Sequence, residues 1–266
     1  MFCTWRKKSS MYPEIDIGSL SFSSYTVLYA LAYFLSIYVF WIELKRRREP
    51  FKIFVLISLT VLLSGFAGAK IFYILFNVSL KDLLIDPVNT MLASGRIYHG
   101  GFIVSILLVY LIARFTKRNF WIISDSIAPA LAISISVGRI GCFLNGCCLG
   151  RPTNLPWGVM FPGIGSSGNL NLHPAQLYES AIMFFLFLFL WKIRKKNYPC
   201  GYIFTLYLLI WGAERFLLEF LRVNTPTPLF LLSVAQIISF VIILLAIYNL
   251  VRLGKSGKKI GACLAP

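Results

Sequence analysis

Long apolar stretches separated by short polar ones dominate the pattern of this chain. Crossing the hydrocarbon core of a bilayer takes about 20 apolar residues in a helix. Seven stretches meet or approach that length, and flanking Gly, Ser and aromatic residues could extend the third, fourth and fifth. The seven predicted spans are Leu20–Ile42, Ile53–Phe76, Gly100–Phe115, Trp121–Val137, Leu177–Ile193, Tyr202–Leu221 and Leu229–Val251. We therefore expect an all-α polytopic membrane protein with about seven transmembrane helices, formed by residues 1–266 as a single integral membrane domain.

Composition supports a lipid environment. The 266 residues are 58% hydrophobic and 14% charged, whereas soluble domains are about 45–50% apolar and about 25% charged. A soluble protein of this size could not bury so much apolar surface. These values exclude an ordinary cytosolic enzyme, a disordered chain and a small disulfide scaffold.

The net charge of +16 comes largely from four basic runs, which hold 15 of the 26 Lys and Arg residues. The runs follow spans one, three, five and seven, so that all four fall on one face of the membrane. Lys and Arg accumulate on the cytoplasmic side, which predicts an outer N-terminus and a basic cytoplasmic tail at residues 252–266. Arg6, Lys7 and Lys8 oppose this orientation with fewer charges. Basic runs at the ends of long apolar segments indicate membrane spans rather than a nucleic-acid partner.

This topology places two long connections, residues 77–99 and 138–176, on the outer face, where we expect them to form a small head. The only two histidines, His99 and His173, both lie there beside a span. Gly100 and Gly101 follow His99 and permit close backbone approach. Because histidine titrates near neutral pH, His99 is a candidate for proton transfer. His173 is equally compatible with a structural role at the start of the next helix.

Span six carries ionisable residues at helical spacing. Trp211, Arg215, Glu219 and Arg222 are separated by four, four and three residues and so share one face. One interpretation is a structural Arg215–Glu219 pair with Arg222 extending to the interface. The other is an anion site, because guanidinium groups bind phosphate through two hydrogen bonds.

Arg139 follows span four within a glycine-rich segment that also contains Asn145 and Gly150. It could contact a lipid phosphate, or simply extend its charge to the interface. At the other end of the same span, we expect Asp125 to cap the start of the helix. Three clustered cysteines are more compatible with small packing residues than with a metal site, because they form no CxxC pair. Whether two of them form a disulfide stays open. The cluster comprises Cys142, Cys147 and Cys148.

Together these segments resemble the bacterial prolipoprotein diacylglyceryl transferases, in pieces that follow the family's order from Tyr25 to about Arg222. Any one piece is weak, and the ordered set is specific. The pieces are Ser24-Tyr25, Gly68-Ala69-Lys70, Tyr98-His99-Gly100-Gly101, Asp125 with Ala128-Pro129, Gly138-Arg139-Ile140-Gly141, Asn145-Gly146, Pro156-Trp157-Gly158, His173-Pro174 with Gln176-Leu177-Tyr178-Glu179, and Arg215-Phe216 with Glu219-Phe220 and Arg222.

The resemblance implies an enzyme of the bacterial cytoplasmic (inner) membrane whose active site lies toward the outer, periplasmic face. Its reaction would move the diacylglyceryl group of phosphatidylglycerol to the lipobox cysteine thiol of a prolipoprotein, releasing glycerol phosphate. This reaction is the first step of lipoprotein maturation. The partners implied are phosphatidylglycerol, the signal-peptide lipobox and membrane lipid, and the family uses no cofactor and no metal.

Within that reaction, our hypothesis assigns roles to the polar residues above. Arg139 and Arg215 would bind the leaving phosphate, and Glu219 would orient Arg215. His99, or a water beside it, would accept the thiol proton. The expected substrate-binding residues are Tyr25, Gly100, Gly101, Asn145, Gly150 and Arg222, with Tyr25 and Asn145 positioning the lipid glycerol.

The chain departs from the family pattern at Lys70, Cys142, Cys147 and Trp211, where the family usually carries Arg, Asn, Glu and Tyr. Two alternatives therefore stay open. One is a related lipid transferase with a different donor or acceptor. The other is a lipid or small-anion transporter, in which ionisable residues line a path.

Overall fold

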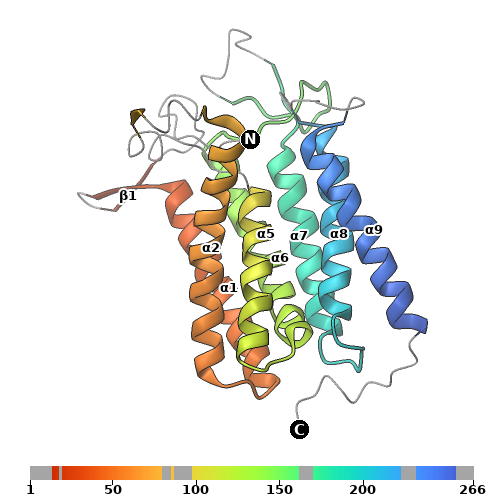
Figure 1. Ribbon diagram of the computed structural model, residues 1–266. Helices are drawn as coiled ribbons and strands as arrows, with labels where there is room; N and C mark the ends of the chain where they lie inside the picture. The colour runs from red at the N-terminus through yellow and green to blue at the C-terminus, as the bar shows by residue number, and fades with distance from the viewer. Residues whose placement is uncertain are drawn as a thin grey trace.

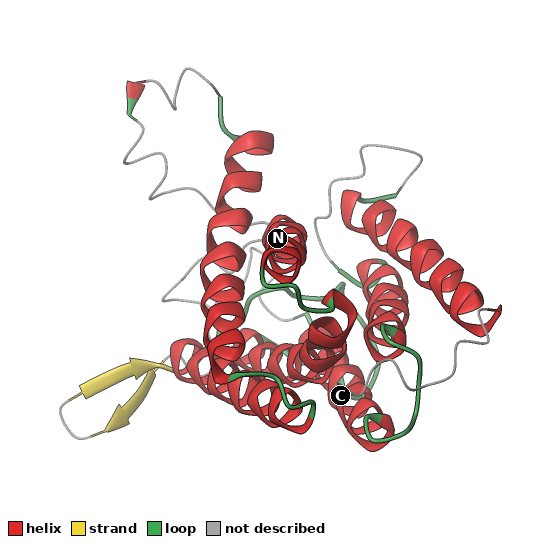
Figure 2. Ribbon diagram, turned by 60° about the horizontal axis from the view of Figure 1, so that its bottom comes forward, coloured by secondary structure: helices red, strands yellow, loops and turns green. Residues whose placement is uncertain are grey.

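Seven helices form an up-and-down bundle in the computed structural model, which describes residues 14–17, 20–79, 85–86, 98–161, 170–222 and 232–255 (Figure 1). A short antiparallel hairpin of β1 (Glu14–Ile17) and β2 (Leu20–Ser23) precedes the first helix and projects from the bundle (Figure 2). The helices of the described chain are α1 (Ser24–Arg46), α2 (Phe51–Asn77), α5 (Tyr98–Phe115), α6 (Phe120–Leu144), α7 (Ala175–Ile193), α8 (Tyr202–Glu219) and α9 (Val234–Lys255).

Five of these helices, namely α1, α2, α6, α7 and α9, are long and apolar enough to cross a membrane. The apolar part of α5 is shorter, covering Gly100–Phe115, and α8 carries Glu214, Arg215 and Glu219 in its second half. The all-α polytopic architecture expected from the hydrophobic pattern is confirmed.

Most helix boundaries differ from the predicted spans by a few residues, and two of the differences bear on the loop end. Residues from Leu20 belong to β2, so α1 begins only at Ser24. Helix α6 continues to Leu144, seven residues past the predicted end, because its glycines do not break it. Gly141 instead lies against α1, where an added Cβ would approach the Cβ of Leu28 to 3.3 Å. The connection expected from residue 138 therefore starts at Asn145.

The prediction that Asp125 caps α6 is wrong. Asn119 is the N-cap, and its side chain accepts a hydrogen bond from the Trp121 backbone N–H. Asp125 lies more than one turn inside α6 and accepts hydrogen bonds from the backbone N–H groups of Gly201 and Phe204, each at 2.8 Å. It thus caps the N-terminus of α8, a helix that begins more than 70 residues later in the chain.

Helix α6 is the centre of the bundle. It packs against α1, α5, α7 and α8, and 44% of its most apolar stretch is buried, against 17% for the peripheral α9. Ile123, Ala130 and Ile133 face one apolar core with α1, α2 and α5. Ala128 and Ala132 face a second core with α7 and α8. The middle of α6 is therefore surrounded by protein, whereas Trp121 and Ile140, near its two ends, are exposed.

The two ends of the bundle differ. At one end, called here the turn end, short connections of residues 47–50, 116–119 and 194–201 join α1 to α2, α5 to α6 and α7 to α8. At the opposite end, the loop end, α6 stops at Leu144, α7 starts at Ala175, and α8 stops at Glu219. The described members of all four basic runs lie at the turn end (Figure 1). Lys258 and Lys259 lie outside the described residues.

At the turn end, an ionic contact joins α1 to the residue that follows α7. The buried Glu43 of α1 pairs with Arg46, one turn later, at 2.8 Å. Its other oxygen accepts a hydrogen bond from Arg194, which follows α7. One carboxylate thus joins two helices that are far apart in the sequence.

The contact between α2 and α5 depends on small residues. An added Cβ on Gly101 would lie 2.4 Å from the backbone oxygen of Gly65, and one on Gly100 would lie 2.3 Å from Phe72. Such stripes let helix backbones approach closely in membranes. This close packing explains why glycine is present at positions 100 and 101. The substrate-binding role predicted for these two glycines is a separate matter.

We expect Gly101→Ala to lower the stability of the protein by about 1–3 kcal/mol, because the clash is with backbone that cannot rotate away. Gly138→Ala is the matched control, since nothing lies within 4 Å of its added Cβ. Thermal unfolding of both variants in detergent checks this. Equal midpoints for the two variants would contradict the tight α2–α5 contact.

Candidate active site

Six ionisable side chains from α6, α7, α8 and the turn that follows α8 meet at the loop end. Glu179, in the second turn of α7, lies at their centre. Its Oε1 pairs with Arg139 Nη2 of α6 at 2.8 Å, and its Oε2 accepts a hydrogen bond from Arg222 Nη2 at 2.7 Å. We call the set the loop-end charge cluster, and its members are Arg139, Glu179, Glu214, Arg215, Glu219 and Arg222.

The α8 side of the cluster follows the predicted spacing. Arg215 Nη2 lies 3.2 Å from Glu219 Oε2, one turn later. Ser233, just before α9, donates a hydrogen bond from its hydroxyl to Glu219 Oε1 at 3.2 Å. Glu219 is therefore held by Ser233 on one side and pairs with Arg215 on the other; that it orients Arg215 during the reaction stays a prediction.

The cluster is almost completely buried. Glu179 is 1% exposed and Arg222 2% exposed, whereas the Arg139 side chain is 19% exposed. Withdrawing charges from water is costly unless partners compensate them. Because Arg139 retains the most exposure, it marks the side from which a substrate could reach the cluster.

Several buried polar atoms in the cluster have no hydrogen-bond partner within the described residues. They are Arg215 Nη1, Arg222 Nε, both carboxyl oxygens of Glu214, and Glu219 Oε2, which makes only the ion pair with Arg215. Buried polar groups in native proteins normally find a partner. Two guanidinium donors that lack an acceptor can bind an anion, and a carboxyl group without a donor can bind a hydroxyl or another hydrogen-bond donor.

The connection from α6 to α7 holds Arg222 in place. The Arg151 backbone N–H donates to Leu221 O at 2.7 Å, and the Arg151 side chain donates to Arg222 O at 3.2 Å. Gly150 pairs with Arg222 in an isolated β-bridge, and an added Cβ at Gly150 would lie 2.4 Å from His173 O. Only glycine fits there, which links the predicted residue Gly150 to the position of Arg222.

Tyr25 and Asn145 also lie at the loop end. Tyr25, at the start of α1, is half-buried, and its ring would lie 3.7 Å from a Cβ added to Gly141. That places it against α6 within two residues of Arg139. Asn145 is the C-cap of α6 and is 7% exposed. Both residues are thus close in the fold to the end of α6 that carries Arg139.

The structure describes the side chain of His173 but not that of His99. The His99 side chain lies outside the described residues, and its backbone is in the first turn of α5, at the loop end. The His173 Nδ1 atom lies 3.3 Å from the Tyr178 hydroxyl, which also accepts a hydrogen bond from Trp157 Nε1 at 2.8 Å. These contacts between the loop and the first turn of α7 favour the structural interpretation of His173.

Departures from the family pattern lie next to the cluster. The thiols of Cys142, Cys147 and Cys148 lie within 4.8 Å of one another; Cys142 and Cys148 are free and buried. Trp211 is 1% exposed and stacks on Tyr207, with 6.2 Å between ring centroids. It lies one turn before Arg215 and fills the core below the cluster.

No role for Glu179 or Glu214 follows from the sequence pattern alone. Glu179 was part of a recognised motif, but its two arginine partners are 40 and 43 residues away, and no spacing rule joins them. Glu214 precedes Arg215 and lies outside the four-residue series of α8. A buried acid in an apolar span was the available signal, since such residues are expensive and normally functional.

The fold and the cluster define a polytopic helical membrane protein with a buried arginine–glutamate site at one end of its bundle. The family model described as prolipoprotein diacylglyceryl transferase matches residues 14–252. The chain belongs to that family.

The chain is similar to proteins named phosphatidylglycerol–prolipoprotein diacylglyceryl transferase in several bacteria. That of Clostridium tetani is 36% identical over 191 residues, covering 70% of this chain and 75% of the relative. That of Mannheimia succiniciproducens is 34% identical over 227 residues, covering 79% and 81%. That of Pasteurella multocida is 33% identical over 267 residues, covering 93% and 96%.

Proposed function

We propose that this protein transfers the diacylglyceryl group of phosphatidylglycerol to the thiol of the lipobox cysteine of prolipoproteins, the first step of lipoprotein maturation. The observation that carries the proposal is the buried cluster in which Glu179 holds Arg139 and Arg222, with unpaired guanidinium donors beside it. Such donors suit the phosphate of the lipid. The names of the relatives supply the donor and the acceptor.

The proposed reaction is a displacement at the glycerol carbon that carries the phosphate ester. The thiol sulfur forms a bond to that carbon while the carbon–oxygen bond breaks, and the phosphate oxygen keeps the electron pair. The thiol proton passes to a base on the protein, and glycerol phosphate leaves. In this scheme, Arg139 and Arg215 neutralise the leaving phosphate, Glu219 orients Arg215, and Tyr25 and Asn145 position the glycerol.

The proposal includes an orientation. The basic residues gathered at the turn end favour a cytoplasmic position for that end, by the preference of Lys and Arg for the cytoplasmic side. The loop end, and with it the charge cluster, would then face the outer side of the bacterial inner membrane.

The direct test is to incubate the purified protein with phosphatidylglycerol vesicles and a synthetic lipobox peptide, and to weigh the peptide by mass spectrometry. A mass gain equal to one diacylglyceryl group is expected, and it should disappear when the peptide cysteine is replaced by serine. No gain, while a family member with known activity succeeds alongside, would overturn the proposal and favour a different donor, acceptor or a transport role.

The proton acceptor can be tested by comparing His99→Gln with Glu214→Gln. We propose His99 as the base, so His99→Gln should lower the transfer rate by about 100-fold, the usual contribution of a positioned base. Glu214→Gln should cost less than about tenfold. Initial rates at saturating lipid check both. A loss below tenfold for His99→Gln would remove it as the base, and a large loss for Glu214→Gln would assign the role to that buried carboxyl instead.

A further inference from the structure

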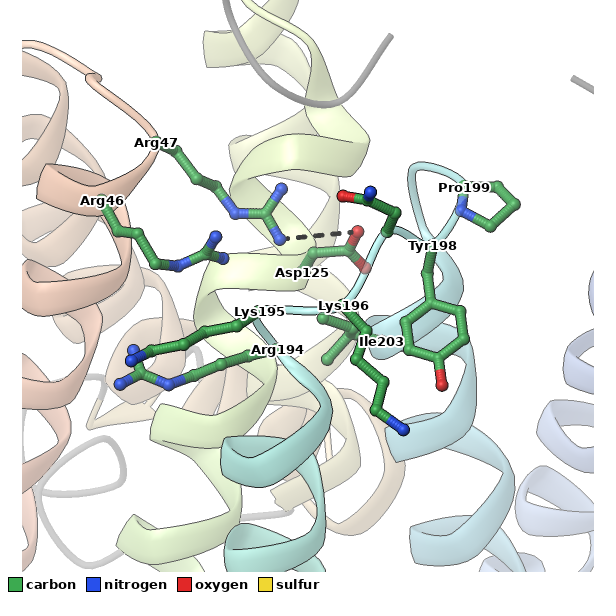
Figure 3. A pocket seen from close by; sticks show the side chains of 10 residues that line it. Arg46, Arg47, Asp125, Arg194, Lys195, Lys196, Tyr198, Pro199 and Ile203 are labelled. Atoms are coloured by element: carbon green, nitrogen blue, oxygen red, sulfur yellow. Dashed lines mark ion pairs between the residues drawn. The ribbon is translucent and has the colours of Figure 1, made fainter. Parts of the chain in front are cut away.

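A small basic pocket lies at the turn end, at the opposite end of the bundle from the charge cluster (Figure 3). It has a volume of about 30 Å³, and a single water needs about 10–15 Å³. The pocket is formed where α1 and α7 end and α6 and α8 begin. Its lining residues are Arg46, Arg47, Asp125, Arg194, Lys195, Lys196, Asn197, Tyr198, Pro199 and Ile203.

Positive charge is in excess around this pocket. Five cationic side chains line it, and Asp125 is its only acidic lining residue in the described chain. Glu43 lies behind the lining and is shared between Arg46 and Arg194. Lys195 and Lys196 are exposed, and no ion pair within the described residues involves them. A third carboxylate, Glu49, also acts on Arg47 and is shared with Arg118, so five lining cations outnumber three nearby carboxylates.

Among the buried arginines of this pocket, Arg47 has the weakest ion-pair contact. It is 6% exposed, and its Nε has no acceptor among the residues that the structure describes. Its Nη2 lies 3.9 Å from Asp125 Oδ2, an oxygen that already accepts a hydrogen bond from the Gly201 backbone. Burial lowers the pKa of the Arg47 guanidinium below its ordinary value. A buried guanidinium in this position can accept a further anionic partner.

Arg194 presents a second such donor. Its side chain is 9% exposed, and its Nε also lacks an acceptor within the described chain. Figure 3 shows Arg46, Arg47, Arg194 and Lys196 arranged around Asp125 and the turn that begins α8. The tyrosine at this turn is fixed by stacking, with 4.4 Å between the ring centroids of Tyr198 and Tyr202.

The position of the pocket indicates which anion it meets. The apolar parts of α1 and α7 end at this level, and exposed lysines follow, so the pocket lies where lipid headgroups begin. Basic pockets between helices at this level bind phosphate-bearing headgroups. The space of about 30 Å³ admits a compact polar group and excludes an acyl chain.

We propose that the turn-end pocket is a second anion site, which binds a phosphate group through Arg47, Arg194, Lys195 and Lys196. The phosphate is carried either by an anionic phospholipid of the adjacent leaflet or by a free phosphate ion. Because the whole bundle separates this pocket from the charge cluster, the site is distinct from the one proposed for transfer.

The test uses the full-length protein in detergent and measures phosphatidic acid binding by native mass spectrometry. The pocket variant is Lys195→Ala with Lys196→Ala, which changes exposed side chains and so preserves the fold. The control is Lys45→Ala with Lys52→Ala, which removes two exposed charges at the same end outside the pocket. The pocket variant should bind phosphatidic acid about tenfold more weakly than the control.

Two further probes identify the source of the phosphate. Phosphatidylcholine should bind equally to the pocket variant and to the control. If inorganic phosphate displaces phosphatidic acid from the control protein and not from the pocket variant, the source is a free phosphate; if it fails to compete, the source is the lipid. Equal phosphatidic acid binding by the pocket variant and the control would overturn the proposal.

Discussion

Replacing Arg139 with alanine should lower diacylglyceryl transfer by at least about 100-fold, the scale seen when one preorganised charge-stabilising group is removed from an active site. Arg139 is the most exposed arginine of the cluster and is held by Glu179 at 2.8 Å. It is therefore positioned to meet the phosphate as the carbon–oxygen bond breaks. The measurement is the initial rate of lipobox-peptide modification at saturating phosphatidylglycerol.

Arg114→Ala is the control for this experiment. Arg114 is an exposed arginine in the last turn of α5, at the turn end, and its loss should leave the rate within about twofold of the unmodified protein because exposed charges contribute little. The rate of each variant is divided by its amount of folded protein in the membrane, because Arg139→Ala also removes one partner of Glu179. If Arg139→Ala retained transfer near the control rate, Arg139 could not neutralise the leaving group.

Replacing Glu179 with glutamine should both destabilise the protein and abolish transfer. Glu179 is 1% exposed and compensates Arg139 and Arg222 at once. Removing one partner from a buried ion pair typically costs about 3–5 kcal/mol, because the remaining charge is left uncompensated. Thermal unfolding in detergent measures the first effect, and the peptide assay on the fraction that remains folded measures the second.

A double-mutant cycle isolates the contact itself. Arg222→Gln should also destabilise the protein, and combining it with Glu179→Gln should cost less than the sum of the two single changes. The reason is that the double variant no longer leaves Arg222 as an uncompensated charge. Strictly additive effects would show that the 2.7 Å contact between Glu179 and Arg222 contributes little.

The helices could be predicted from the sequence because hydropathy acts locally along the chain. The Arg215–Glu219 contact was predictable for the same reason, since residues four apart on a helix always face each other. The grouping of Arg139 with Arg222 was not, because it depends on how α6, α7 and the end of α8 pack. Helix packing in membranes depends on small surface features that a hydropathy pattern does not record.

The failed prediction for Asp125 has the same origin. Its position near the start of a span suggested a cap, and it is a cap, but for α8. The choice between capping its own helix and capping a neighbour depends on tertiary contacts. Asn119 already occupies the local position, with a hydrogen bond of 2.9 Å to Trp121. Asn119 and Asp125 are both capping residue types and lie six residues apart. One helix start needs only one N-cap, so the second was free to cap another helix.

The position of Glu43 has a consequence for biosynthesis. Helix α1 leaves the ribosome long before Arg194, which follows Glu43 by 151 residues. During that interval the carboxylate would enter the membrane without its later partner. Arg46, one turn further along the same helix, pairs with it at 2.8 Å and needs no other segment to do so. Arg46 therefore acts as a counterion that α1 carries with it during insertion, and Arg194 joins the pair only when α7 arrives.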